Sequence, residues 1–555
     1  MPPRQGLGIR GNGLSAESTN AAASFGRVAG APPAARGDRR FLIATLVLVA
    51  AFTLMRIVYA SAFDLRTDEA YYWTWSKETV LSYLDHPPMI AWLIRFGTAI
   101  FGDTNLGARF GGIVALAVTE LLLADIVRRV TRDVRWGLLA VLMCEATPYY
   151  GLLMAKVEPD VALIPFATAM LWSLVRLAET RDGRWWLAAG LFFGLALLSK
   201  YTALLLLPAV AAFALIPDWR GRWLRSPYPW LGALLALAVF SPVLWWNADN
   251  GWASFRFQAV RAATSGSLSL RTVADLFALQ LGQVGPVMLP VVLPGTVILA
   301  MRGLRQREPV AILLAASVLV PLLYFLERSL TLRVGDTWPM FVWPPAFAAV
   351  AINIADMVRT GAPARAIAAA RRWTWAAIAS GAALVLLVFA YTLYAPVALF
   401  GRIDPIGAEA GYAPVAEAAL AEMNRIGATW IATYDYRTYA MLRWFVKDRA
   451  PVVQINERAR FIGFHDPGMD RIDGHPGLFV THGGLTTAAA FKGTTAIVAN
   501  GPAVDRTWRG VTYDTYRLDA ISDWSPDLNP PPGSDGYRWQ SLAALRNHAA
   551  TPGRG

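Results

Sequence analysis

Hydrophobic residues are concentrated in long runs that short polar segments separate along most of the chain. The first run, residues 41–63, is long enough to cross a hydrocarbon layer of about 30 Å as a helix. Further runs of this kind lie at 107–127, 136–154, 158–177, 185–199, 201–217, 229–246, 276–300, 309–326, 338–357 and 374–395. The pattern predicts a polytopic α-helical membrane protein with about eleven transmembrane helices.

Basic residues indicate the orientation of these runs. Arg36, Arg39 and Arg40 precede the first run, which places the N-terminus in the cytoplasm by the positive-inside rule. Later basic clusters follow the second, fourth, sixth, eighth and tenth runs, within 128–135, 176–184, 220–225, 302–307 and 359–372. Each cluster falls on the predicted cytoplasmic side. Residues 1–40 are rich in Gly, Ala, Pro and Arg, and they predict a disordered cytoplasmic tail.

Composition agrees with this class and excludes others. Of 555 residues, 55% are hydrophobic and 16% are charged, whereas soluble domains carry about 25% charged residues. These values exclude a soluble enzyme and a disordered protein, and the single cysteine, Cys144, excludes a disulfide scaffold or a cysteine metal site. A net charge of +12 would suit a protein that binds nucleic acid. The placement of the arginines in predicted cytoplasmic loops explains this charge better.

The last part of the chain has a different pattern. Short β-rich runs and helix-like stretches alternate there, with strands expected at 430–434, 451–455, 478–481, 495–499 and 511–517 and helices at 414–424 and 438–447. This alternation predicts a small α/β domain outside the membrane. The predicted organisation is a transmembrane domain at 41–398, an outer α/β domain at 399–522 and a flexible Pro/Gly-rich tail at 523–555.

Two adjacent carboxylates, Asp68 and Glu69, directly follow the first run on its outer side. Acidic residues at a membrane edge usually face a polar cavity. They are also typical of a simple helix start, because Thr67 could cap the helix and acids favour the first turn. Tyr71 and Tyr72 come next and fit an interfacial aromatic belt.

A second outer motif is Asp85-His86-Pro87-Pro88, before an apolar stretch. The two prolines fix a turn and then allow a helix to start. A helix N-terminus with an imidazole nearby is a natural phosphate site, although a single histidine is more often structural.

Further outer charges lie at Lys156, at Glu158-Pro159-Asp160 and at Lys200. Glu158 and Asp160 fit a well-capped helix start, but they lie on the same side as Asp68. Lys200 occupies a tight outer turn, where it breaks the positive-inside pattern, so it either snorkels or contacts an anion.

Three charges within or beside the apolar runs remain. Arg56 in the first run and Arg333 near the tenth also stand where a cation is unexpected. Glu120, deep in the second run, is a plausible partner for one of them.

In this order and on one side of the membrane, these elements resemble the GT-C membrane glycosyltransferases. More narrowly they resemble family 39, which contains the protein O-mannosyltransferases and the bacterial aminoarabinose transferases of lipid A. The resemblance covers about residues 41–345 and rests on Asp68-Glu69, Tyr71-Tyr72-Trp73, Asp85-His86-Pro87-Pro88, Glu158-Pro159-Asp160, Lys200-Tyr201 and residues 250–258. Glu158 stands where the family usually has Thr, and His86 where the aminoarabinose transferases have Lys, which argues against that sugar.

The resemblance implies a GT-C fold and an inverting glycosyltransferase that moves a sugar from a polyprenyl-phosphate donor to a hydroxyl or phosphate on a lipid, glycan or protein. The implied site has Asp68 as general base with Glu69 and Asp160 as further catalytic residues, His86, Lys200 and Arg333 at the donor phosphate, and Asp85, Glu158, Tyr71 and Tyr72 at the substrate. No cofactor or metal is expected, although a carboxylate-rich site could bind a divalent cation incidentally.

The expected location is the bacterial inner membrane, with the active site and the C-terminal domain facing the periplasm. The alternative is a transporter or flippase for lipid-linked saccharides. A transporter should show interrupted helices in two repeated halves, and the sequence has no such symmetry.

Overall fold

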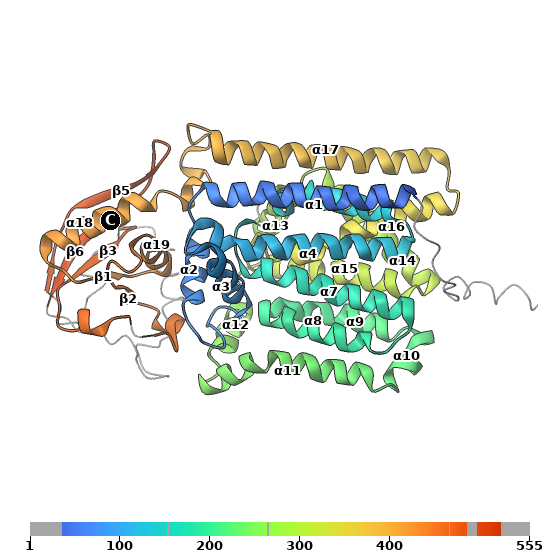
Figure 1. Ribbon diagram of the computed structural model, residues 1–555, viewed down its shortest axis with the longest axis horizontal. Coiled ribbons are helices and arrows are strands. Elements are labelled where there is room, and N and C mark those ends of the chain that lie inside the picture. The colour runs from blue at the N-terminus through green and yellow to red at the C-terminus, as the bar shows by residue number, and fades with distance from the viewer. Residues whose placement is uncertain (1–35, 153–154, 264–265, 466, 485–496, 523–555) are drawn as a thin grey trace, which may run out of the picture.

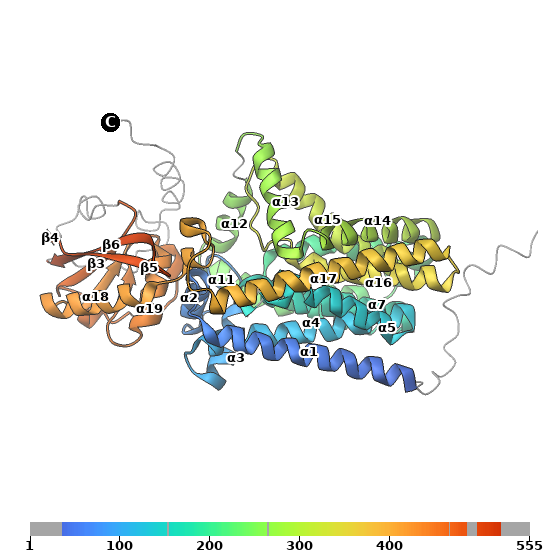
Figure 2. The ribbon, with the colours of Figure 1, turned by 90° about the horizontal axis from the view of Figure 1, so that it is seen from above.

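The computed structural model describes residues 36–152, 155–263, 266–465, 467–484 and 497–522. Long helices lie side by side in a bundle, and a small sheet domain stands at one end of it (Figure 1, Figure 2). The predicted tail at 523–555 and most of the predicted tail at 1–40 lie outside the described residues. The division of the chain at residue 398 stays a prediction, although the last bundle helix ends near it, at Tyr394.

Each predicted membrane run contains helix. The bundle helices are α1 (Arg36–Ala62), α4 (Asn105–Thr131), α5 (Val134–Glu145), α6 (Pro148–Gly151), α7 (Pro159–Thr180), α8 (Trp185–Ser199), η3 (Tyr201–Leu206), α9 (Leu207–Ala214), α10 (Pro217–Leu224), α11 (Tyr228–Asp249), α13 (Leu270–Val284), α14 (Met288–Gln306), α15 (Pro309–Ser329), η4 (Met340–Val342), α16 (Trp343–Arg359) and α17 (Ala364–Tyr394). Three further helices, α2 (Thr67–Ser76), α3 (Met89–Phe101) and α12 (Ala253–Ala263), lie at the end of the bundle that faces the sheet domain (Figure 1).

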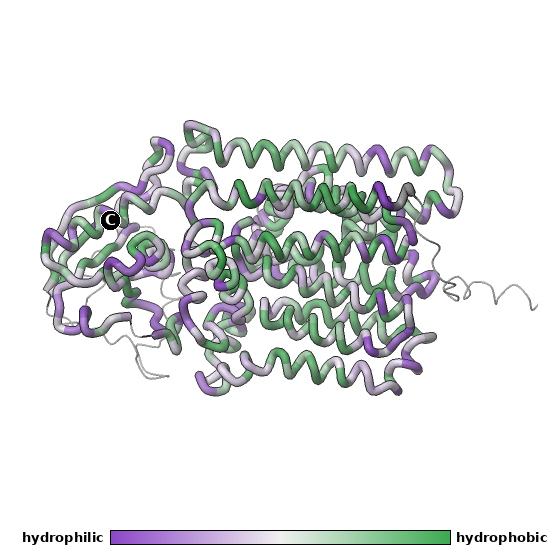
Figure 3. Tube along the Cα trace, in the orientation of Figure 1, coloured by the Kyte–Doolittle hydropathy of each residue, from purple (hydrophilic) through white to green (hydrophobic). Residues whose placement is uncertain are grey.

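Among the described residues, eight helices are long and apolar enough to cross a membrane, and three shorter apolar helices accompany them at Met89–Phe101, Trp185–Ser199 and Tyr201–Ala214. Hydrophobic residues line the long helices, and hydrophilic ones gather toward their ends (Figure 3). Large apolar side chains such as Leu234 and Leu387 are mostly exposed, as expected for a surface that contacts lipid. The predicted number of about eleven spans stays a prediction.

The predicted run at 276–300 is not a single helix. It is divided into α13 and α14 at Gly285, which has a φ of +110°. Glycine adopts this backbone conformation readily, but it does not occur inside an α-helix. The next residue, Pro286, has no N–H to donate to a helical hydrogen bond, so the helix ends here. The run at 136–154 is also shorter than expected, because α5 ends at Glu145, just before Thr147-Pro148.

Two features hold the bundle together. Helices α8 and α11 approach so closely that a Cβ on Gly190 would lie 2.0 Å from the carbonyl oxygen of Gly232, a packing typical of membrane helices with small residues. Arg56 of α1 pairs at 3.0 Å with Glu120 of α4 and also contacts Glu145 of α5. The prediction that Glu120 is the partner of an intramembrane arginine is therefore confirmed for Arg56.

The C-terminal domain has a six-stranded sheet in the order β2-β1-β3-β6-β4, with β5 paired to β6. Its strands are β1 (Trp430–Thr433), β2 (Val452–Gln454), β3 (Gly477–Thr481), β4 (Ile497–Ala499), β5 (Ala503–Trp508) and β6 (Val511–Ser522). Strands β2, β1 and β3 are parallel, whereas β6 is antiparallel to its neighbours. The predicted α/β class and its five expected strands are confirmed, and β5 is a strand that the prediction missed.

Two helices, α18 (Tyr412–Ile426) and α19 (Tyr436–Val446), pack on one face of this sheet. Short 3-10 turns complete the domain at η5 (Gly401–Ile403), η6 (Gly407–Glu409), η7 (Arg458–Phe461) and η8 (Met469–Arg471). Helix α19 also packs on α2 of the membrane domain, where the rings of Trp73 and Trp444 meet edge to face with centroids 5.0 Å apart. The sheet domain is therefore in direct contact with the segment that carries Asp68 and Glu69.

Candidate functional site

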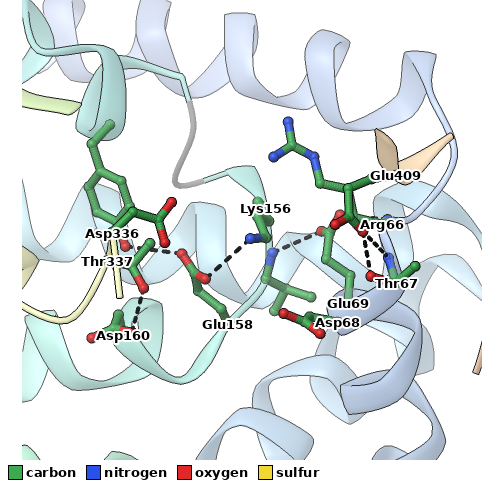
Figure 4. A network of polar contacts seen from close by, with 12 residues as sticks. Arg66, Thr67, Asp68, Glu69, Lys156, Glu158, Asp160, Asp336, Thr337 and Glu409 are labelled. Carbon is green, nitrogen blue, oxygen red and sulfur yellow. Dashed lines mark hydrogen bonds and ion pairs between the residues drawn. The ribbon is translucent and has the colours of Figure 1, made fainter. Parts of the chain in front are cut away.

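Five of the polar residues singled out by the sequence lie in one network of contacts, namely Asp68, Glu69, Lys156, Glu158 and Asp160 (Figure 4). Asp68 and Glu69 lie in the first turn of α2, Glu158 is the N-cap of α7, and Asp160 lies in the first turn of that helix. Residues more than 80 positions apart in the chain thus meet in one network.

Glu69 is the best-anchored carboxylate of this network. It is fully buried, and it accepts hydrogen bonds from Arg109 at 2.7 and 2.8 Å, from the Val157 N–H at 2.9 Å and from the Arg66 N–H at 3.0 Å. Burial alone would raise the pKa of Glu69, but the Arg109 guanidinium holds it below the ordinary value. Its two oxygens each have two donors, so Glu69 fixes the start of α2 against α4 and the loop before α7.

Asp68, one residue earlier, has different surroundings. It is partly exposed, and its Oδ1 accepts a hydrogen bond at 3.3 Å from the hydroxyl of Tyr436, a residue of the C-terminal domain. No cation of the described residues lies within ion-pair distance of it. This carboxylate is open to a ligand in a way that Glu69 is not.

Asp160 and Lys200 form a buried ion pair of 2.6 Å that joins α7 to the turn after α8. Thr337 donates a second hydrogen bond to the same oxygen at 3.1 Å. The other oxygen, Oδ1, is buried without a hydrogen-bond partner in the described part of the chain. Lys200 also lies 6.0 Å from the ring of Trp338.

Glu158 lies between this pair and Asp68. It contacts the ammonium of Lys156 at 3.4 Å and accepts a weak hydrogen bond from Tyr149 at 3.4 Å. Burial raises the pKa of Glu158 to about 7, with Asp160 adding to the shift and Lys156 opposing it. The site therefore holds a carboxyl group that changes charge near neutral pH.

This shift predicts a pH-dependent effect of Glu158→Gln. Because the folded protein binds the Glu158 proton more tightly than the unfolded chain, the wild-type protein loses stability as pH rises from about 4.5 to about 7. The glutamine variant lacks this loss. We expect the melting temperature of the variant, relative to wild type, to be higher at pH 8 than at pH 5. An equal difference at both pH values in a thermal-denaturation series would contradict the assignment.

Asp85 is held by three groups. Nη1 of Arg460 lies 2.7 Å from each carboxylate oxygen, Tyr71 donates to Oδ2 at 2.9 Å, and Gln258 donates to the backbone carbonyl at 2.5 Å. Burial opposes ionisation, but Arg460 holds the pKa of Asp85 below its usual value. Asp85 is therefore a charged anchor for the His86 loop and for Tyr71.

His86 follows this anchor in the chain. Burial lowers its pKa to about 3, and the nearby Lys200 adds to this shift. A neutral imidazole would meet a phosphate as a hydrogen-bond donor through its N–H group. Its Nδ1 has no hydrogen-bond partner among the described residues. Tyr72 lies next to it, with ring centroids 6.3 Å apart.

Arg333 takes no part in the ion pairs that join the described residues of the cluster. Its side chain is exposed, and no ion pair connects it to the described acidic residues. The cation that approaches the Lys200 region is instead Arg261, whose guanidinium lies 5.5 Å from the ring of the same Trp338 that Lys200 approaches. Arg261 contributes to the positive charge around His86.

Several site residues were not predicted from the sequence: Arg109, Arg261, Thr337, Tyr436 and Arg460. Of these five residues, only Arg261 lies close to a sequence motif, the segment 250–258 that is part of the family resemblance. The described residues hold no group of three or more His, Cys, Asp or Glu side chains that could bind a metal ion. The expectation of no cofactor stays a prediction.

This architecture, an apolar helical bundle with a charged cluster at the end that carries an α/β domain, defines a class of polytopic membrane protein. Comparison with solved structures shows the same fold in ArnT from Cupriavidus metallidurans bound to undecaprenyl phosphate. That structure has a TM-score of 0.57 and 17% sequence identity, and the match covers 88% of this chain and 99% of that one.

Sequence comparisons narrow the class. Residues 85–246 match the family model described as dolichyl-phosphate-mannose-protein mannosyltransferase. The chain is 32% identical over 248 residues to the lipid A galacturonosyltransferase RgtD of Rhizobium johnstonii, over 44% of this chain and 51% of that one. It is 30% identical over 171 residues to an undecaprenyl phosphate-alpha-4-amino-4-deoxy-L-arabinose arabinosyl transferase of Pseudomonas aeruginosa, over 29% and 30% of the two chains. The matches thus span about half, or less, of these relatives.

These matches and the fold support the predicted resemblance to the GT-C membrane glycosyltransferases of family 39. The apolar helices and the bacterial relatives indicate a multi-pass bacterial membrane protein.

Proposed function

We propose that the chain is an inverting glycosyltransferase that moves a sugar from a polyprenyl-phosphate donor to a hydroxyl or phosphate of a lipid, glycan or protein acceptor. The observation that carries this proposal is the pairing of a partly exposed carboxylate, Asp68, with a buried cationic region around Lys200 at one end of the bundle. The names of the relatives, all transferases of sugars, favour this function over a transporter or flippase.

The donor side of the proposed reaction uses Lys200, His86 and Arg261. A polyprenyl phosphate must depart as an anion, and preorganised donors in a site that excludes water stabilise such a charge strongly. Lys200 now binds one oxygen of Asp160, and two of its three N–H groups remain to meet a phosphate. Of the three predicted phosphate ligands His86, Lys200 and Arg333, the exposed Arg333 has the weakest structural support, because it forms no ion pair with the described acidic residues.

The acceptor side uses Asp68. Its carboxylate takes the proton of the acceptor hydroxyl while that oxygen forms a bond to the anomeric carbon. The bond between this carbon and the phosphate oxygen breaks, and its electron pair leaves with the phosphate. Attack opposite to the leaving group inverts the anomeric configuration. Glu69 holds the backbone that presents Asp68, and Glu158 and Tyr72 are the proposed contacts to the sugar.

The proposed setting is the inner membrane, with this end of the bundle and the C-terminal domain in the periplasm. The basic clusters support this orientation, because they lie at the other ends of the helices.

A reconstitution assay tests the proposal. Purified protein in liposomes is incubated with radiolabelled polyprenyl-phosphate sugars (galacturonate, mannose and aminoarabinose) and an extract of bacterial glycolipids. Transfer of label from one donor to an extracted acceptor, absent with heat-inactivated protein, is the expected result. Movement of the intact labelled donor across the bilayer without transfer would instead establish a flippase.

A further inference from the structure

The C-terminal domain reaches into the candidate site, and we propose that it completes this site. Tyr436 acts as a positioning residue for Asp68, and Arg460 acts as one for Asp85. This inference rests on the proposed function, and it gives the domain a part in the reaction instead of a mere attachment to the bundle.

Tyr436 is fixed at the start of α19. Asp435 caps this helix by accepting hydrogen bonds from the N–H groups of Arg437 and Thr438. The Tyr436 hydroxyl donates to Asp68, and Nε of Arg437 donates to that hydroxyl at 3.3 Å. Burial raises the pKa of Tyr436 to about 12, so the phenol keeps its proton. A donor held in this way selects one orientation of the Asp68 carboxylate.

Arg460 connects the same domain to the second motif. It binds Asp85, and its guanidinium lies 4.6 Å from the ring of Tyr436. Tyr71, which also binds Asp85, has its ring 4.9 Å from Tyr436. The contact between Arg460 and the ring of Tyr436 thus connects the partners of Asp85 and Asp68. Without the C-terminal domain, each of these two carboxylates would lose one of its partners.

Tyr436→Phe tests the role of the hydroxyl, because phenylalanine keeps the ring contacts and removes only the donor. We expect a folded protein, a donor KM within about twofold of wild type and a kcat lowered by about tenfold. Tyr394→Phe, at an exposed tyrosine that ends α17, is the matched control and should keep the wild-type kcat.

The outcomes separate the two levels of the proposal. A wild-type protein that transfers no sugar overturns the proposed function itself. A wild-type protein that is active, with a Tyr436→Phe variant whose kcat equals that of wild type, overturns only the positioning role. A purely structural defect would lower the yield or melting temperature and leave the kcat of the folded fraction unchanged.

A separate cavity has a volume of about 390 Å³, within the range of about 300–1,000 Å³ that is common for ligand sites, and its lining does not include Asp68, Tyr436 or Arg460. Its aromatic lining comprises Tyr439 of α19 together with Phe461 and Phe464, whose rings follow one another at centroid distances of 5.0 and 5.5 Å. The cavity is distinct from the cluster of charged residues around Asp68. A ligand could bind in it whether or not the chain transfers a sugar.

Basic side chains dominate the polar lining of this cavity. Arg443, Arg458, Arg471 and Lys77 contribute four cations against the acidic Glu78 and Asp448. Glu78 is engaged by the backbone N–H and the ring of His465. Aromatic rings offer apolar faces on which sugar rings can pack, and guanidinium groups bind phosphate and carboxylate with two N–H donors. We infer that this cavity binds an anionic saccharide, a sugar that carries phosphate or carboxylate.

Binding of hexose 1-phosphate and of methyl hexoside to the detergent-solubilised full chain, measured by calorimetry, tests this site. We expect the phosphate to bind and the neutral glycoside to bind at least about tenfold more weakly. The double variant Arg443→Ala/Arg471→Ala should lose about tenfold in affinity, a difference of about 1.4 kcal/mol. The double variant Arg425→Ala/Arg449→Ala removes the same charge from exposed arginines outside the cavity and should bind as wild type does.

Equal affinity in both double variants, or loss of binding in Lys200→Ala with retention in Arg443→Ala/Arg471→Ala, would overturn the assignment to this cavity. A parallel titration with lipid A distinguishes the sources of the saccharide. Lipid A binding that depends on Arg443 and Arg471 identifies a glycolipid headgroup, whereas binding of the hexose phosphate alone identifies a soluble ligand.

Discussion

Asp68→Asn is expected to insert and fold as wild type does but to lose about 10²–10⁴-fold in the rate of sugar transfer, the range for loss of a general base. Asparagine keeps the size of the side chain, and its amide oxygen can still accept the Tyr436 hydrogen bond, whereas the amide cannot take a proton from the acceptor. The measurement is single-turnover transfer in liposomes with saturating donor and acceptor.

The matched control is Asp64→Asn. Asp64 is an exposed carboxylate four residues earlier, and its side chain contacts only Asn105 among the described residues. It should transfer at the wild-type rate. If Asp68→Asn were as active as wild type, Asp68 could not be the base, and the acceptor proton would have to leave by another route.

Lys200→Ala is expected to weaken use of the donor by more than tenfold in kcat/KM, with the acceptor KM little changed. Lys200 is buried beside Asp160, so its ammonium would stabilise the departing phosphate in surroundings of low dielectric, where each charge contact counts most. The measurement is a full kinetic series in which donor and acceptor are varied separately.

Removal of Lys200 also leaves Asp160 as a buried charge without its cation, which by itself destabilises a protein. The double variant Lys200→Gln/Asp160→Asn keeps a neutral pair at this position and separates the two effects. We expect the double variant to recover stability but not donor use. Lys447→Ala, an exposed lysine of the C-terminal domain, serves as the control. A double variant with wild-type donor kinetics would show that Lys200 has only a structural role.

Local patterns predicted most of the fold. The apolar runs, the basic clusters and the alternation after residue 400 depend on residues close together in the chain, and each has its counterpart in the helices or in the sheet. The errors came from local breaks of a long run, at Gly285-Pro286 and after Glu145. In both places the run of apolar residues continues, although the backbone cannot continue as a helix.

The sequence predicted which residues belong to the site, but not which of them bind one another. Asp68 and Glu69 are adjacent and chemically alike, yet Glu69 is bound by Arg109, 40 residues away in an apolar run, whereas Asp68 remains accessible. Lys200 and Asp160 were both expected at the site, and their direct ion pair was not. Such pairings depend on which helices become neighbours, and no local pattern contains that information.

Tyr436 and Arg460 show the same limit across domains. They lie 368 and 375 residues from Asp68 and Asp85, the groups they contact. Around them the sequence shows only a helix start and a short turn. Arg333 had a sequence signal, its unusual place in the charge pattern, and its role at the donor phosphate stays a prediction because its exposed side chain pairs with no described acidic residue.

The central claim is a single displacement at the anomeric carbon, with Asp68 as the base. The most direct test is the anomeric configuration of the transferred sugar, determined by NMR on the product made by purified protein from a donor of known configuration. The mechanism predicts the opposite configuration in every product molecule. A product with the configuration of the donor would require two displacements and would contradict the proposed role of Asp68.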